Sequence, residues 1–369
     1  MKKLLFAIPL LLFLILSMQG YTYAQEQTAE RILHDTLKSV ESIDSSSIDF
    51  TETAENLLTG DISFSFGDIL KTLLDLLFKE IKDNLSVLIK MLVLAILAGI
   101  LCNLQQAMPE GGIGEISFLA CFSVIAGLSV TIVANLSELA AQTIDSLMLF
   151  IASLMPVLCS LVSSAGQVAM NGFYPALFLA MQTFVAICQQ FFLPLITVVT
   201  ALSVINAMSN RFQISGLIGT TRKIIKWGLG LLLTVFVGIL GIHSFSAFAT
   251  GSVAGRTVKY ALCNFIPIVG NVLAESIEAV ISSMRLIRGA TGITGVLVLV
   301  SACALPLIKI LIVSFLYRFA AGVAEPATDK RIVLLLMDLS GNITLIFAIL
   351  LMVSVMFIIS IALLCGFFF

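Results

Sequence analysis

The sequence has very little charge for its length. Asp, Glu, Lys and Arg make up only 11% of its 369 residues, whereas hydrophobic residues make up 59%. A soluble globular protein carries about a quarter charged residues. The shortage of charge therefore excludes a soluble fold. It predicts an all-α polytopic membrane protein, because only helices and closed barrels satisfy backbone hydrogen bonds inside a bilayer and the apolar runs have helical length.

Sequence motifs of common enzyme active sites are also absent. The chain contains no GxxxxGK[ST] loop, no HExxH, no GxSxG and no CxxCH. ATP hydrolysis, metalloprotease chemistry, serine hydrolysis and haem attachment therefore have no support. The seven Cys form no CxxC or Cys/His spacing and lie in or beside apolar runs, which excludes a structural zinc site. We expect no enzymatic activity, no cofactor and no nucleic-acid partner.

The first 24 residues have the pattern of a signal peptide. Lys2 and Lys3 precede an apolar run over residues 4–16, and small and polar residues follow up to Ala24. We predict cleavage after Ala24. The alternative is an uncleaved anchor helix, but the apolar run is shorter than the roughly 20 residues that a spanning helix needs.

Residues 25–83 form an acidic region that we expect outside the cytoplasm. Thirteen acidic residues lie between Glu26 and Asp83, against five basic ones. The apolar residues from Ile69 to Ile81 mostly share one helical face, which predicts an amphipathic helix at the end of this region. Export of the preceding segment would carry the whole region across the membrane.

The transmembrane domain is predicted over residues 84–369, with about eight spans and Pro/Gly-broken or re-entrant segments. The apolar block from Phe173 to Met208 would be about 54 Å long as one helix, against a hydrocarbon core of about 30 Å. We predict a tight turn inside it at Gln189, Gln190 and Pro194. The spans are placed near residues 85–104, 116–135, 146–163, 173–190, 191–208, 227–250, 292–317 and 343–366. None of these spans contains Asp or Glu, which disfavours proton-coupled transport.

Basic residues set the orientation of the spans. A loop near residue 211 has the highest density of Lys and Arg and should be cytoplasmic, which agrees with five crossings from an external N-terminal region. The basic residues at 318, 330 and 331 fall on the same side. Residues 251–291 do not fit this scheme: the segment would lie outside, yet it has four basic residues and two acidic ones.

The same segment contains the strongest candidate for a functional break in the membrane fold. Asn264, Pro267, Gly270 and Asn271 interrupt helical structure. Broken helices at membrane depth line cavities or binding sites in transporters, so these four residues are predicted to line or gate a pathway. The alternative is a kinked helix that only packs.

Five further residues are candidates for the same pathway. Lys309 follows Pro306 by one helical turn inside an apolar run, where a charge needs a partner or water. His243 is a candidate proton carrier, although a lone His is more often a hydrogen-bonded packing residue. Gln189 and Gln190 either line a path or form hydrogen bonds between helices.

Parts of the sequence resemble the stage III sporulation protein AE family of endospore-forming bacteria. The resemblance is carried by Arg256-Thr-Val-Lys259, by Asn264-Phe-Ile-Pro-Ile-Val-Gly270 and by Pro306-Leu-Ile-Lys309. It extends from the signal peptide to the last helix. The resemblance assigns no catalytic residue.

The resemblance implies a subunit of the channel that joins the mother cell to the forespore. Such a subunit would lie in the outer forespore membrane with a secretion-type ATPase and ring-forming proteins of its operon, and would contact a forespore partner. It would be needed for late forespore development. Three hypotheses remain open: a permease-like conduit for small molecules, a structural scaffold for the complex, and a stand-alone secondary transporter.

Overall fold

The computed structural model describes residues 82, 89–90, 92–93, 96–97, 99–100, 113–164, 173–208, 214–265, 270–326 and 328–364. The predicted signal peptide, nearly all of the acidic region, the amphipathic helix and Pro267 lie outside them. The elements of these ranges are helical: α4 (Ile113–Ser164), α5 (Phe173–Ile187), the π-helical segment η2 (Cys188–Phe192), α6 (Leu193–Met208), α7 (Ser215–Phe265), α8 (Gly270–Ala324) and α9 (Lys330–Leu364).

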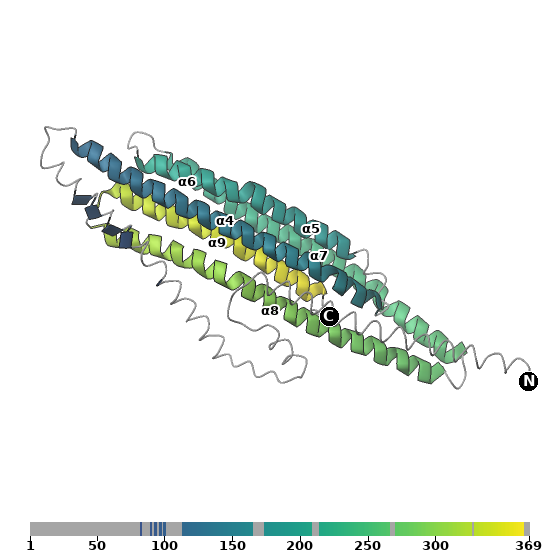
Figure 1. The fold of residues 1–369 in the computed structure, drawn as a ribbon. Helices are drawn as coiled ribbons and strands as arrows, with labels where there is room; N and C mark the ends of the chain where they lie inside the picture. Colours follow the sequence, from purple (N-terminus) through teal and green to yellow (C-terminus); the bar gives the residue numbers. More distant parts are fainter. Residues whose placement is uncertain are drawn as a thin grey trace, which may run out of the picture.

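The helices form an elongated antiparallel bundle around α9 (Figure 1). Helix α9 contacts α4, α6, α7 and α8. Its most apolar stretch is 61% buried, whereas the corresponding stretches of the other four long apolar segments are only 28–39% buried. An apolar helix with few exposed positions belongs in the centre of a bundle. The all-helical membrane architecture predicted from composition is therefore confirmed for the described residues.

Five segments are long and apolar enough to cross a membrane: Phe118–Pro156, Pro175–Met208, Ser215–Gly241, Gly292–Ala324 and Lys330–Leu363. The sequence predicted seven spans over the same part of the chain. Two predicted pairs are each one continuous segment, which reduces seven spans to five. The shortest of the five has 27 residues, about 40 Å as a helix, so each exceeds a hydrocarbon core of about 30 Å.

The tight turn predicted at Gln189, Gln190 and Pro194 is not present. The chain runs from α5 into α6 through η2, and the residues at both ends of η2, Ile187 and Leu193, have right-handed helical backbone angles. The Leu193 N–H donates to the Cys188 carbonyl. This wider turn immediately precedes Pro194, which has no N–H to continue the regular ladder. The proline therefore produces a π-helical turn here and not a reversal of the chain.

The second merged pair places two carboxylates in the middle of a helix. Residues 136–145 were predicted to connect two spans, but they lie inside α4. They contain no Gly or Pro, and Leu, Ala, Glu and Gln among them favour helix. Glu138 and Asp145 are consequently part of the longest apolar segment. The sequence-based statement that no acidic residue lies in a span is wrong.

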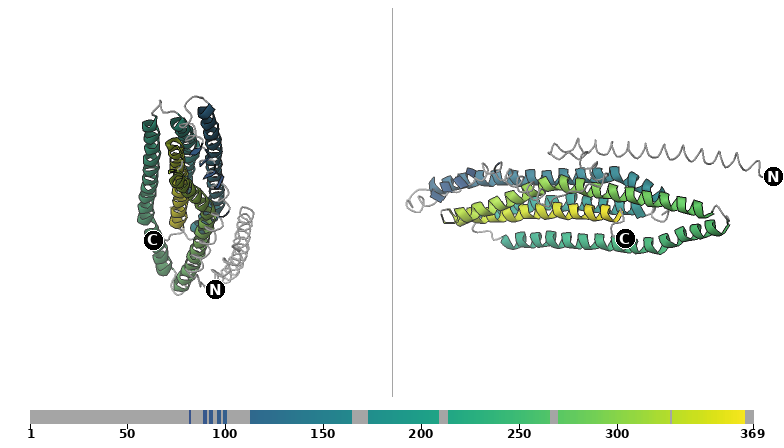
Figure 2. Two further views of the ribbon diagram at one scale, coloured as in Figure 1. Left: turned by 90° about the vertical axis from the view of Figure 1, so that its left-hand side faces the viewer. Right: turned by 90° about the horizontal axis from the view of Figure 1, so that it is seen from below.

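Helices α7 and α8 extend well beyond the apolar bundle. Their distal parts, residues 242–265 and 270–291, lie outside the membrane-length segments and project together past the end of α9 (Figures 1 and 2). The predicted break at residues 264–271 is confirmed as a place where helices end, since α7 ends at Phe265 and α8 begins at Gly270. No short re-entrant half-helix is seen in the described parts of this region.

Candidate functional site

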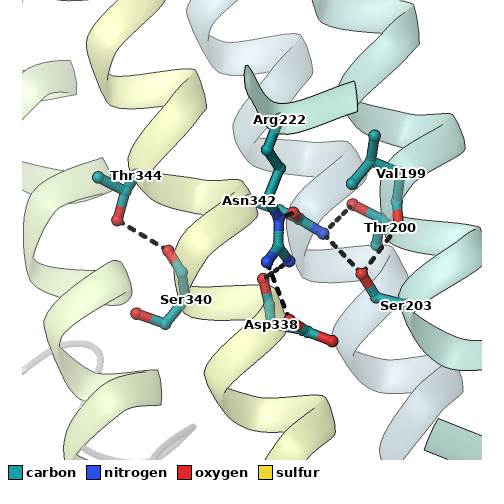
Figure 3. A network of polar contacts seen from close by, with 8 residues as sticks. All are labelled: Val199, Thr200, Ser203, Arg222, Asp338, Ser340, Asn342 and Thr344. Atoms are coloured by element: carbon teal, nitrogen blue, oxygen red, sulfur yellow. Dashed lines mark hydrogen bonds and ion pairs between the residues drawn. The ribbon is translucent and has the colours of Figure 1, made fainter. Parts of the chain in front are cut away.

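A charged network connects three helices near one end of the bundle (Figure 3). Arg222 of α7 donates from Nη1 to Asp338 Oδ1 at 2.9 Å and from Nη2 to the Asp338 carbonyl at 2.7 Å. Its Nε donates to Asn342 Oδ1 at 2.9 Å. The two charged side chains are 21% and 23% exposed, so both are mostly withdrawn from solvent. Each of the three guanidinium nitrogens thus has a partner on α9.

Asn342 extends the network to α6. Its Nδ2 donates to Thr200 Oγ1 at 3.1 Å and to Ser203 Oγ at 3.4 Å. The two hydroxyls donate in turn to backbone carbonyls one turn earlier on α6. Asn342 is fully buried and uses both its donor and its acceptor. A polar network whose members are all satisfied stabilises one arrangement of helices, so we interpret these residues as a lock between α6, α7 and α9.

The sequence contains a weak signal for this network, which our sequence analysis missed. Asp338 and Asn342 are four residues apart, and such residues share a helical face. A planar guanidinium has the donor geometry to engage both a carboxylate and an amide. However, Arg222 was interpreted only as one of several basic residues in a loop. Its partners on α9 are more than 100 residues away, and only the fold brings them together.

Hydroxyl groups also connect α8 to α9. Ser314 donates to the Ser340 carbonyl at 3.0 Å, Ser340 donates to the Ser314 carbonyl at 2.9 Å, and Ser314 and Thr344 hydroxyls are 2.8 Å apart. Further along, Ser354 donates to Cys303 Sγ at 3.1 Å. Hydrogen bonds between small polar residues are a common means of holding membrane helices together. These contacts set the register of α8 against α9.

A second polar surface lies on the outside of α4. It consists of exposed side chains at positions four and three residues apart, and we call it the acidic face of α4: Thr131, Asn135, Glu138, Gln142 and Asp145. Gln142 donates to Glu138 at 3.3 Å. Gln189 of η2 donates to Asp145 at 2.8 Å and to the Ala141 carbonyl at 3.2 Å. The π-helical turn thus contributes a side chain to this face.

The described candidates for the pathway lie on several different helices. Lys309 is exposed on α8, and α8 continues through Pro306 without a break. Gln189 contacts α4, whereas Gln190 is exposed. Four further candidates lie in or beside the projecting parts of α7 and α8. They are Asn264, Gly270, Asn271 and His243, whose side-chain surroundings the structure does not describe.

Basic residues gather at the end of the bundle that holds the network. Arg222, Lys223 and Lys226 lie in the first turns of α7, and Lys330 and Arg331 begin α9. The Arg331 guanidinium carbon lies 5.5 Å from the centre of the Phe118 ring at the start of α4. Asp329 caps α9 by accepting from the Arg331 N–H at 2.9 Å. Among the described residues, no three His, Cys, Asp or Glu side chains are grouped to hold a metal ion.

The comparisons with known proteins identify one family. The sequence profile described as Stage III sporulation protein AE matches residues 48–367. Stage III sporulation protein AE of Bacillus subtilis (strain 168) is 31% identical over 304 residues, which cover 82% of this chain and 76% of that protein. No solved structure matches the chain. The matched region includes each described helix, the charged network and the acidic face of α4.

Proposed function

Since the chain belongs to the stage III sporulation protein AE family, we propose that it is a membrane subunit of the channel complex linking mother cell and forespore. The observation that carries this proposal is a family match over almost the whole length, joined to five membrane-length helices. The protein would lie in the outer forespore membrane and be needed for late forespore development. Its partners would include other proteins of the stage III complex, with a secretion-type ATPase, ring-forming proteins and a forespore-side protein.

The distribution of charge supports a definite orientation in that membrane. The basic ends of α7 and α9 would face the mother-cell cytoplasm, in accordance with the positive-inside rule. Each of the two merged pairs of predicted spans removes one crossing. The number of crossings before residue 209 therefore falls by two, and the loops after that residue keep the side assigned to them from the sequence. With residues 85–104 as the first span, the acidic N-terminal region and the projecting parts of α7 and α8 lie together outside. That side faces the intermembrane space, where a forespore partner would be met.

Within this complex the chain would form a permease-like conduit for small molecules, or would line part of one. Two features favour this role over a purely passive anchor. The locked end of the bundle holds α6, α7 and α9 in one arrangement, and the acidic face of α4 brings two carboxylates into an apolar helix. Intramembrane carboxylates usually face water, a pathway or a partner.

A structural scaffold is the second candidate, and one observation favours it. Lys309 is exposed on α8, whereas Asn264 lies at the end of α7 and Gly270 and Asn271 at the start of α8, so these candidates are spread over separate parts of the described helices. In a scaffold the same helices would orient partner rings, and nothing would pass through this subunit.

Solute uptake separates the two functions. The full chain, alone and with its complex partners, is reconstituted into liposomes, and entry of small metabolites of different size and charge is measured. A conduit gives uptake that requires this chain, whereas a scaffold gives none that depends on it. In sporulating cells, Lys309→Met combined with Asn264→Leu is compared with the unaltered chain at equal membrane insertion. Normal sporulation with both changes would remove these residues from any conduit.

A further inference from the structure

The acidic face of α4 has the geometry of a surface that another helix covers. Exposed positions recur with alternating spacings of four and three residues over two turns on either side of Glu138. They continue as the apolar residues Val124 and Leu128 at one end and Leu149 at the other, which are 51%, 44% and 65% exposed. A repeat of 3.5 residues along one face is the pattern of a seam between two packed helices.

Lipid is an unsuitable neighbour for the middle of this seam. Asn135, Glu138, Gln142 and Asp145 follow one another on it inside the apolar segment of α4. Polar and ionisable side chains in a span face protein or water, because transfer of a carboxylate into hydrocarbon is costly. Asp145 accepts a hydrogen bond from Gln189, whereas among the described residues Glu138 accepts only from the neutral Gln142. The centre of the seam therefore lacks a positive partner among the described residues.

The same chain carries an unmatched cation at the same level. Lys309 of α8 is exposed, and the one ion pair among the described residues is Arg222–Asp338. The hydrogen bonds of Ser314 and Cys303 to α9 bracket Lys309, which places it level with about residue 347. Two contacts align α4 with α9. Phe118 of α4 lies against Arg331 of α9, and the side chains of Leu154 of α4 and Ile361 of α9 both lie beside Gly295 of α8.

These contacts place Glu138 and Lys309 at nearly the same position along the long axis of the bundle. Phe118 is level with Arg331, and Leu154 is level with Ile361. The residue halfway between the first members of these pairs, residue 136 on α4, is therefore level with the residue halfway between the second members, residue 346 on α9. Glu138 and Lys309 therefore lie within about one helical turn of the same height, a difference that a lysine side chain can span. They do not pair within one chain.

We propose that the acidic face of α4 is an interface for a second copy of this chain, with Glu138 of one copy paired to Lys309 of the other. The pairing gives each of these two intramembrane charges an opposite partner and covers the helical seam. Reciprocal pairing closes a dimer, whereas head-to-tail pairing closes a ring. This association goes beyond the proposed function and holds whether or not solute passes through the subunit.

Cross-linking between differently tagged copies tests the contact directly. One full-length copy carries Glu138→Cys and the other carries Lys309→Cys. Both are expressed together, and the membranes are treated with a bifunctional thiol cross-linker whose arm matches the reach of a Glu–Lys pair, because a direct disulfide would be too short. We expect a covalent product that contains both tags. The matched control replaces the second change with Leu179→Cys, which lies on α5 and not on α8 and is 62% exposed. Unaltered chains report any cross-link from native cysteines.

Charge-reversed variants provide a second test of the same contact. In bilayer nanodiscs, Glu138→Lys alone and Lys309→Glu alone should each shift the protein from the multimer to single copies. The two changes in one chain should restore the multimer, because the pair is again complementary. Both sites are exposed, and equal melting temperatures confirm that the variants fold. The proposal is overturned by cross-linking no greater than the Leu179→Cys control, by reversed variants that still associate, or by a cross-link to another protein in place of a second copy.

Discussion

Arg222 reaches Asp338 twice, through the carboxylate at 2.9 Å and through the backbone carbonyl at 2.7 Å, and so fixes the start of α7 against α9. The third contact, to Asn342, continues to α6. Three helices are thereby held at one end of an otherwise apolar bundle. Apolar packing alone gives little directional preference between membrane helices, so this network determines their register.

Arg222→Lys should destabilise the protein although it keeps the charge. An ammonium group cannot reproduce three donors in one plane toward Asp338 and Asn342. We expect a loss of about 1–3 kcal/mol, discounted from the usual cost of breaking a buried pair because about a fifth of each side chain is exposed. The measurement is thermal unfolding of the purified chain in detergent. Lys223→Arg, at an exposed neighbouring position, is the control and should unfold like the unaltered protein.

Asn342→Leu should be more harmful than Thr200→Val. The first change leaves the Arg222 Nε–H without its acceptor and removes the donor to two buried hydroxyls, at about 1–3 kcal/mol. The second keeps the shape of the side chain and removes one hydroxyl, at about 1 kcal/mol. Unfolding in detergent compares the two variants. Equal losses would contradict a network centred on Asn342.

Gly228→Ala should loosen the contact between η2 and α7. A Cβ at position 228 would lie 2.7 Å from Phe192 Cζ, so the buried ring must move, at about 1–2 kcal/mol. Gly230→Ala is a close control on the same helix, because nothing lies within 4 Å of the added carbon and alanine favours helix. We expect Gly230→Ala to be neutral or stabilising, and Phe192→Leu to relieve much of the Gly228→Ala defect.

Single cysteines should report the sidedness of the bundle ends. Replacements at Lys226 and Ala327 should react with an impermeant thiol reagent only from the cytoplasm, and replacements at Val258 and Leu286 only from the opposite side. The physical reason is that Lys226 lies at the basic end, position 327 precedes the basic start of α9 in the sequence, and the second pair lies on the projecting parts of α7 and α8. Labelling of position 258 from the cytoplasm alone would refute this orientation.

Gln189→Leu tests the role of the π-helical turn. The change removes the donor to Asp145 and to the Ala141 carbonyl, but it leaves the apolar packing of η2 intact. We expect a small loss of stability, about 1 kcal/mol, measured by thermal unfolding in detergent. Gln190→Leu, at an exposed position, should leave the unfolding temperature unchanged.

The sequence by itself determined the class of the protein, the position of one helix break and the basic end of the bundle. Composition identified a helical membrane protein, and the break near residues 264–271 was located because a cluster of Asn, Pro and Gly disfavours a regular helix. The cluster of basic residues identified one end of the bundle. Each of these conclusions depends on properties of single residues or short segments, which no packing partner has to supply.

The tertiary structure determined which contacts these residues make. Hydropathy did not distinguish a turn from a π-helical step at Pro194, or a loop from a continuous helix at Glu138, because both depend on where neighbouring helices pack. The Arg222 network joins residues more than 100 positions apart. Lys309, expected in a pathway, is exposed on α8, since the face that a helix presents to its neighbours is determined by the whole assembly and not by local spacing.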